Sequence, residues 1–264
     1  SEEYLGRALG SARQEVVIST KVGITGRTTP PNASRSYIFE EVDRSLKRLG
    51  TDYIDLYQIH AFDPAVPLEE TLQALHELVT SGRVRQVGCS QFSGAQVLEA
   101  RKTAEAMGIT PFATCMAEYS LLVRKSEEEL LPAARDSAMS FLPFFPLASG
   151  LLTGKYGSGK SLPAGARLNN PEFAQFHLNA DNLDLVDRLT RFALDRGHTL
   201  LELAFAWILS EPAVPTVIAG ATSAEQVSAN AQALGWVLSG EELDQIRSII
   251  GDHHADGFTG FPKT

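Results

Sequence analysis

The chain has 264 residues, of which 44% are hydrophobic and 21% are charged, and its formal net charge is −9. This composition is typical of a globular protein, and no apolar stretch is long enough to span a membrane. The negative charge and the scattered lysines and arginines disfavour nucleic-acid binding, which needs a basic surface. Cys89 and Cys115 lie in apolar runs and form no disulfide framework, so we expect a cytoplasmic protein in a reducing compartment.

The first predicted elements are a helix, a strand and a second helix. Ser1, followed by two glutamates, opens a helix that ends near Gly10. A β-branched run at residues 16–22 predicts a strand that carries Lys21 near its end. Apolar residues at helical spacing then predict a helix that Gly50 ends. The chain begins with neither methionine nor a signal peptide, so we expect it to start partway into a longer protein.

Strands and helices continue to alternate along the chain. β-rich or apolar runs predict further strands at residues 53–60, 84–89, 112–119 and 141–147. Helices are predicted after Pro67, after Ser93, and at Ser126, which stands at capping-box spacing from Glu129. This alternation predicts a parallel sheet.

The C-terminal part reads as less regular. Residues 148–179 are rich in Gly, Pro, Ser and Asn, and we expect this long segment to be a cofactor clamp or lid. Further elements are predicted as helices at residues 183–194 and 200–209, a short strand at 216–218, helices that begin at Ser223 and Ser239, and a loop at 251–264. Glu242 stands at capping-box spacing from Ser239.

Periodicity alone does not distinguish a doubly wound sheet from a closed barrel. Residues suited to a site nevertheless stand at the C-terminal ends of different runs, namely Lys21, His60, Ser90 with Gln91, Phe144 and Gly220. In a (β/α)₈ barrel these ends converge on one face, where sites are built. We therefore favour the barrel, of which six strands are found here and two are missing.

Lys21 and His60 are the candidate catalytic residues. A single lysine at a strand end more often extends to water, and a single histidine there more often packs in the core. Together in one cleft they would suit the activation of a carbonyl oxygen. The imidazole can donate to the oxygen, and the lysine charge can lower the pKa of a nearby proton donor.

Three other motifs were weighed for phosphate or metal binding. Residues 154–161 match the Walker A pattern, but the residues that follow cannot readily begin the helix which that site requires. The turn at Gly220 leads into a helix start that could bind an anion, or Ser223 and Gln226 could form a plain capping box. His253 and His254 lack further ligands, so no metal site is predicted.

Several motifs resemble the aldo-keto reductase superfamily, and they follow its order over nearly the whole chain. They are residues 1–6 (SEEYLG), 19–23 (STKVG), 45–50 (SLKRLG), 52–57 (DYIDLY), 88–90 (GCS), 118–122 (EYSLL), 146–156 (PLASGLLTGKY) and 219–223 (AGATS). The resemblance implies one barrel domain over residues 1–264, with 148–179 as the cofactor-clamping loop and 239–264 as the C-terminal helix and tail. It also implies NADP(H) as cofactor and hydride transfer to an aldehyde or ketone.

The superfamily has a catalytic tetrad of Asp, Tyr, Lys and His, and Lys21 and His60 match its last two members. The resemblance places the Asp and the Tyr just before a motif such as that of residues 1–6, so they are expected upstream of Ser1. The same missing part corresponds to the first two barrel strands, which agrees with the count of six. Tyr4 lies inside the first helix and does not match the catalytic tyrosine.

The resemblance also implies a set of cofactor-binding residues. Those expected at the nicotinamide are Ser90, Gln91 and Phe144; at the pyrophosphate, Phe145, Pro146, Leu147, Ser149, Lys155 and Arg167; and at the adenosine end with its 2′-phosphate, Gly220, Thr222, Gln226 and Asn230. Three positions depart from the usual pattern. Gln91 replaces Asn, Phe144 replaces Tyr or Trp, and Met116 replaces a glutamine that usually helps to hold the carboxamide.

The sequence thus predicts an NADPH-dependent reductase of a small carbonyl substrate, or an alcohol dehydrogenase that runs the reverse reaction. It would be a monomer or a homo-oligomer that binds neither nucleic acid nor membrane. The alternative is a binding or regulatory barrel that resembles the potassium-channel beta subunits and turns over slowly or not at all. Met116, Phe144 and the missing half of the tetrad motivate that alternative.

Overall fold

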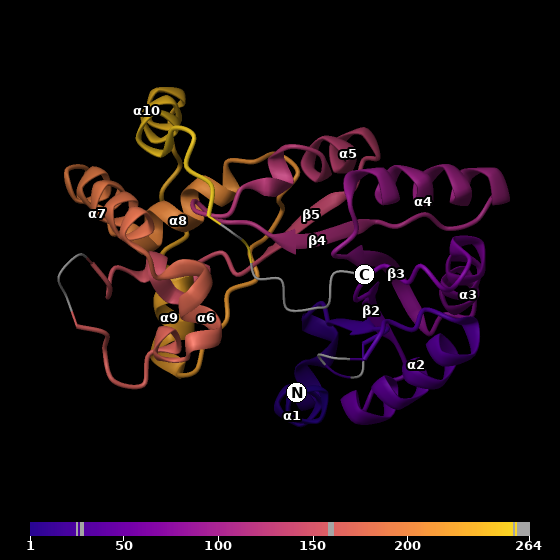
Figure 1. The fold of residues 1–264 in the computed structure, drawn as a ribbon. Coiled ribbons are helices and arrows are strands. Elements are labelled where there is room, and N and C mark those ends of the chain that lie inside the picture. Colours follow the sequence, from indigo (N-terminus) through magenta and orange to yellow (C-terminus); the bar gives the residue numbers. More distant parts are fainter. Residues whose placement is uncertain (25, 27–28, 158–160, 256, 258–264) are drawn as a thin grey trace. The chain divides into compact units, whose positions relative to one another are not determined.

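The computed structural model describes residues 1–24, 26, 29–157, 161–255 and 257 (Figure 1). These residues divide into two compact units. The first unit holds Ser1–Met116 and Glu129–Ser140, and the second holds residues 117–128 and 141–257. Strands and helices alternate through the first unit, as the sequence predicts.

Five strands of the described residues form one sheet in the order β1-β2-β3-β4-β5. They are β1 Ser19–Val22, β2 Ile54–Ile59, β3 Val84–Ser90, β4 Thr114–Glu118 and β5 Ser140–Phe144. The pairs β1–β2, β2–β3 and β3–β4 are parallel. The first five predicted strands and the parallel sheet are therefore confirmed, although β1 begins three residues later than predicted and β5 ends three residues earlier.

The sixth predicted strand, at residues 216–218, was wrong. This segment lies along β5, where the Ile218 amide donates to the Pro143 carbonyl at 3.4 Å and the Phe141 amide donates to the Ala213 carbonyl at 2.7 Å. These bonds do not make a continuous ladder. Pro215 lies between them and has no N–H to donate, which interrupts strand pairing.

Helices cover the sheet of the first unit. They are α1 Glu2–Leu9, the 3₁₀ helix η1 Gly10–Glu15, α2 Arg35–Leu49, α3 Leu68–Thr80, α4 Gly94–Met107 and α5 Leu130–Asp136. Figure 1 shows α2, α3 and α4 on the same side of β2 and β3. α2 ends as predicted at Gly50, whose φ of 65° suits glycine. The Ser93 side chain caps α4 in a capping box with Gln96.

The predicted capping box of Ser126 and Glu129 was wrong. Residues Lys125–Glu127 form a 3₁₀ helix (η2), and α5 begins only at Leu130. The buried Ser126 hydroxyl donates instead to the Glu118 carbonyl at 3.3 Å. Ser126 therefore lies inside η2, four residues before α5 begins, and is not at a helix N-cap position.

The second unit is largely helical. Its helices are α6 Pro171–His177, α7 Ala180–Leu194, α8 Leu200–Leu209, α9 Ala224–Gln232 and α10 Gly240–Ile250, with 3₁₀ helices η3 Ala148–Thr153 and η4 Arg167–Asn169. The predicted long irregular segment 148–179 was therefore partly wrong, since η3, η4 and α6 lie within it. Asn170 caps α6 and Pro171 stands in its first turn, a start signal that the loop-like composition concealed.

Other expectations for the second unit can be checked where residues are described. The capping box of Ser239 and Glu242 at the start of α10 is confirmed. The Walker-like motif falls partly on residues 158–160, which lie outside the described residues, and no helix begins within residues 161–166. Of the predicted C-terminal loop, residues 256 and 258–264 also lie outside them. Among the described helices, none combines the length and apolarity that crossing a membrane requires.

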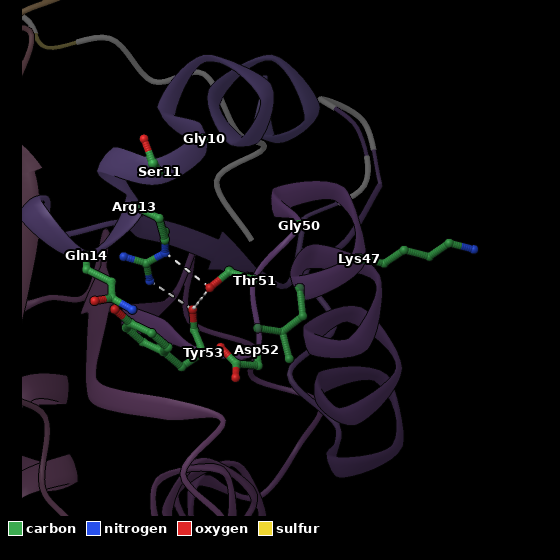
Figure 2. A pocket seen from close by; sticks show the side chains of 10 residues that line it. Gly10, Ser11, Arg13, Gln14, Lys47, Gly50, Thr51, Asp52 and Tyr53 are labelled. Atoms are coloured by element: carbon green, nitrogen blue, oxygen red, sulfur yellow. Dashed lines mark hydrogen bonds between the residues drawn. The ribbon is translucent and has the colours of Figure 1, made fainter.

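A cavity of about 630 Å³ opens beside the start of β2, at the N-terminal ends of the strands (Figure 2). Arg13 lies on its wall and donates to the Tyr53 carbonyl at 2.9 Å and to the Thr51 hydroxyl at 3.2 Å. Its guanidinium also pairs with Asp55 at 2.8 Å and stacks 4.2 Å from the centre of the Tyr53 ring. With these partners Arg13 ties η1 to β2, a structural role.

Candidate active site

Lys21 and His60 lie at the C-terminal ends of neighbouring parallel strands. β1 ends at Val22 and β2 ends at Ile59, and the His60 amide donates to the Val22 carbonyl at 2.8 Å. Gly23 then turns the chain with a φ of 110°, a conformation that side chains disfavour. The strand end that carries Lys21 is thereby joined to the backbone of His60.

Strand register places these two residues in consecutive rows on one face of the sheet. Side chains alternate along a strand, so residues two apart share a face. The first row consists of Lys21, Gln58, Gly88 and Thr114, and the second row contains His60, Ser90 and Met116. The predicted catalytic pair and the predicted nicotinamide residue Ser90 are thus together on one face of the first unit.

The two catalytic candidates also interact electrostatically. Burial, and to a smaller extent the charge of Lys21, lowers the pKa of His60 from its ordinary value of 6.5 to about 4. Burial likewise lowers the pKa of the Lys21 ammonium below its ordinary value of 10.5. At neutral pH His60 is therefore a neutral imidazole, which can donate one N–H to a carbonyl oxygen.

The lowered pKa of His60 predicts how stability depends on pH. Between pH 6.5 and about 4 the unfolded chain binds a proton that the folded His60 refuses. The contribution of His60 to the free energy of unfolding is therefore complete above pH 6.5 and is lost as the pH falls toward 4. Denaturant unfolding at several pH values should show that the free energy of unfolding falls less steeply between pH 6.5 and 4 in His60→Gln than in the wild type. Equal slopes would contradict the burial of a neutral His60.

Gln91 connects the second row to β4. Its φ of 57° is unusual for a residue with a side chain. Its amide donates to the Met116 carbonyl at 2.8 Å, and its side-chain nitrogen donates to the His60 carbonyl at 3.1 Å. Met116 is buried, with 2% of its surface exposed, and presents a thioether where an amide was expected. The Gln91 side chain is therefore bonded to the backbone of His60, and the Met116 side chain beside Ser90 offers no amide.

A second group of predicted residues lies in the second unit, at the end of β5. The rings of Phe144 and Phe145 meet edge to face, 5.4 Å apart. The Arg167 guanidinium lies 5.3 Å from the centre of the Phe145 ring and 4.5 Å from that of Phe173. Pro146 is buried and Leu147 half-buried behind them. The structure therefore brings Arg167 to the loop that follows β5.

The loop after β5 has the features of an anion cradle. Positive φ values occur at Ala148 (45°), Ser149 (57°) and Gly150 (99°), a backbone form that can turn amides toward one centre. The buried Ser149 hydroxyl has no hydrogen-bond partner among the described residues. A Cβ at Gly150 would lie 3.4 Å from the Lys155 ammonium. An unsatisfied donor, a cation and a bare backbone together suit a phosphate group.

The third group surrounds the start of α9. The Ser223 hydroxyl accepts from the Gln226 amide at 3.3 Å, and the Thr222 amide donates to the Gln226 side chain at 2.8 Å. The Ser223 cap is thus formed, while the side chain of Gln226 bonds to Thr222 in place of Ser223. Gly220 is exposed, and Asn230 lines an apolar cavity of about 190 Å³ together with residues of α8 and α9.

The described part of the chain contains no cluster of metal-binding side chains. No group of three or more His, Cys, Asp or Glu side chains there could hold an ion. The His253 imidazole donates from Nε2 to the side-chain oxygen of Asn182 at 2.7 Å, which connects the C-terminal segment to α7.

The first unit thus presents a half-buried lysine and a half-buried histidine at adjacent strand ends. A profile of the aldo/keto reductase family matches residues 1–251. The chain belongs to the aldo/keto reductase family. The (β/α)₈ barrel predicted from the sequence is the fold of this family, and the described parallel sheet supplies five of its strands.

Individual relatives of this aldo/keto reductase chain agree with that assignment. It is 35% identical to the aldo-keto reductase YhdN of Bacillus subtilis over 97% of this chain and 77% of the relative. It is 34% identical to the L-glyceraldehyde 3-phosphate reductase of Escherichia coli K12, over 96% and 76%. It is also 36% identical to a probable voltage-gated potassium channel subunit beta of Oryza sativa, over 95% and 79%.

Sequence reasoning missed three residues of this aldo/keto reductase that lie next to Lys21, namely Gln58 and Thr114 of its own row and Ser19 two residues before it. Gln58 is fully buried and bonds to Ser19 and Thr114. Two signals were available. The first is that Gln58 is a polar residue inside an apolar strand. The second is spacing: Ser19 stands two residues before Lys21, and Gln58 stands two residues before His60, so the members of each pair share a face of the sheet.

Proposed function

We propose that this chain is the main part of an NADPH-dependent carbonyl reductase that converts an aldehyde or ketone to an alcohol. The observation that carries the proposal is the pairing of Lys21 with His60 at adjacent strand ends, with burial lowering the pKa of both. A family of oxidoreductases provides the context. When bound, NADPH supplies the hydride for the carbonyl carbon.

The two residues have different roles in this scheme. Neutral His60 donates its N–H to the carbonyl oxygen, which orients the substrate and favours negative charge on that oxygen. The Lys21 charge lowers the pKa of the proton donor, which we assign to a tyrosine upstream of Ser1, with an aspartate there as partner of Lys21. Positioned proton transfer of this kind contributes about 10²- to 10⁴-fold.

Each unit is assigned its own cofactor-binding residues. In the first unit Ser90 and Gln91 would contact the nicotinamide. In the second unit Phe144 would contact the nicotinamide ring, and Gly220, Thr222, Gln226 and Asn230 would contact the adenosine end. The loop after β5, with Phe145, Pro146, Leu147 and Ser149, would hold the pyrophosphate between Lys155 and Arg167. The orphan hydroxyl of Ser149 and the two cations favour this placement of the negative charge.

The position of Arg167 in the second unit leads to a prediction about NADPH binding. Arg167→Met should weaken NADPH binding by about 10- to 100-fold, because a charge-assisted hydrogen bond contributes about 1.5–3 kcal/mol. Lys102→Met, which removes an exposed charge from α4, is the control and should leave the affinity unchanged. Titration of NADPH fluorescence measures both. An Arg167→Met protein with wild-type affinity would remove Arg167 from the cofactor site.

A second candidate function is a regulatory barrel that binds the cofactor and turns over slowly. The relatives described as channel beta subunits favour it, as does the apolar Met116 beside Ser90. Oxidation of NADPH at 340 nm with a panel of small aldehydes and ketones separates the two. Steady turnover supports the reductase. Tight NADPH binding without turnover supports the regulatory barrel, and no binding at high micromolar NADPH would contradict both.

A further inference from the structure

Gln58 connects strands on both sides of its own. Its side-chain oxygen accepts from the Ser19 hydroxyl of β1 at 3.0 Å, and its side-chain nitrogen donates to the Thr114 hydroxyl of β4 at 3.1 Å. The residue itself lies in β2 and is fully buried. One amide therefore bridges β1, β2 and β4, and we refer to Ser19, Gln58 and Thr114 as the amide bridge.

The amide bridge depends on a gap in β3. Gly88 stands between Gln58 and Thr114 in the strand register. A Cβ at Gly88 would lie 2.1 Å from the Thr114 hydroxyl and 3.3 Å from Cγ of Gln58. Because glycine leaves this space open, the Gln58 side chain can pass over β3 and reach β4.

The amide bridge adjoins both catalytic candidates. Gln58 is the register partner of Lys21 and stands two residues before His60 on the same face. Its oxygen accepts from the hydroxyl of Ser19, which stands two residues before Lys21 on the same strand. The strand that carries Lys21 and the strand that carries His60 are thus joined by a side-chain hydrogen bond in addition to their backbone pairing.

We infer that Gln58 is a positioning residue for Lys21 and His60, an inference that rests on the reductase function proposed above. A buried amide is costly unless both of its ends are bonded, and an apolar side chain would fill the same core at lower cost. The bonded amide instead adds side-chain links from β2 to β1 and to β4, which restrain the strand ends that carry Lys21 and His60. Small displacements of reacting groups lower rates strongly, by about 10²-fold for 1 Å.

Replacement of Gln58 by methionine, which has similar length but no amide, tests the inference. Gln58→Met should lower kcat by about 10- to 100-fold while the NADPH affinity stays within about twofold. Loosening of the amide bridge should also admit water to His60 and raise its pKa from about 4 toward 6.5, as measured by NMR titration of the imidazole. Thr114→Val should change both quantities in the same direction.

The matched control is Thr71→Val, which removes another buried hydrogen bond of the first unit, from the Thr71 hydroxyl to the Ala33 carbonyl at 2.9 Å. It should leave kcat and the pKa of His60 unchanged. The inference is overturned if the pKa of His60 is the same in Gln58→Met as in the wild type, or if Thr71→Val shifts it equally. Because the NMR titration needs no turnover, it decides the role of Gln58 even if the wild type reduces no carbonyl.

Discussion

Replacement of Lys21 by methionine should lower kcat by about 10²- to 10⁴-fold and leave NADPH affinity nearly unchanged. Methionine keeps most of the side-chain volume, so the core around β1 stays filled. What it removes is the charge, which interacts with His60 and which we assign to lowering the pKa of the proton donor. Initial rates of NADPH oxidation and fluorescence titration measure the two effects separately.

Lys47→Met is the control for the loss of one positive charge. Lys47 is exposed on α2, and Figure 2 shows its side chain directed away from the neighbouring residues of the cavity. Its replacement should leave kcat within about twofold, since exposed charges contribute little. A Lys21→Met protein with near-normal kcat, or an equal loss in Lys47→Met, would remove Lys21 from the catalytic mechanism.

Replacement of Gly88 by alanine should destabilise the fold by about 3 kcal/mol. The new methyl group would lie 2.1 Å from the Thr114 hydroxyl and 2.8 Å from the Thr114 carbonyl oxygen. The carbonyl belongs to the backbone of β4, so relief requires the strands themselves to move. The shift would also break the bond from Gln58 to Thr114, so kcat should fall in whatever fraction remains folded.

Gly240→Ala provides the comparison for Gly88→Ala. Gly240 begins α10 and has no neighbouring atom within 4 Å of an added Cβ, so its replacement should change stability by no more than about 0.5 kcal/mol. Urea unfolding of the two variants measures the difference. Similar stabilities of the Gly88→Ala and Gly240→Ala proteins would contradict the close packing of β3 against β4 at Gly88.

Much of the fold follows from local sequence signals. The runs that end at Lys21 and His60 are apolar and β-branched, and glycine stands after the α2 helix, so strands and helix ends could be placed by simple rules. Pro215 and Ser126 show where such rules fail. A proline stands directly before one predicted strand and has no N–H to pair, and Ser126 lies in a 3₁₀ helix before the predicted helix begins.

The candidate site was predictable only in part, for a different reason. Lys21 and His60 stand at strand ends in the sequence, so they could be paired once a parallel sheet was assumed. Gln58 could not be connected with Thr114 in this way, because the contact passes over Gly88 and depends on the register of three strands. The helices within residues 148–179 were concealed by a composition that is usual for loops.

Lys21 and His60 lie at adjacent strand ends and act on each other electrostatically. NMR titration of His60 in Lys21→Met tests this claim most directly. Removal of the lysine charge should raise the pKa of His60 above its wild-type value of about 4, yet leave it below 6.5, because burial is the larger cause of the shift. A pKa of His60 unchanged by the loss of Lys21 would contradict the claim.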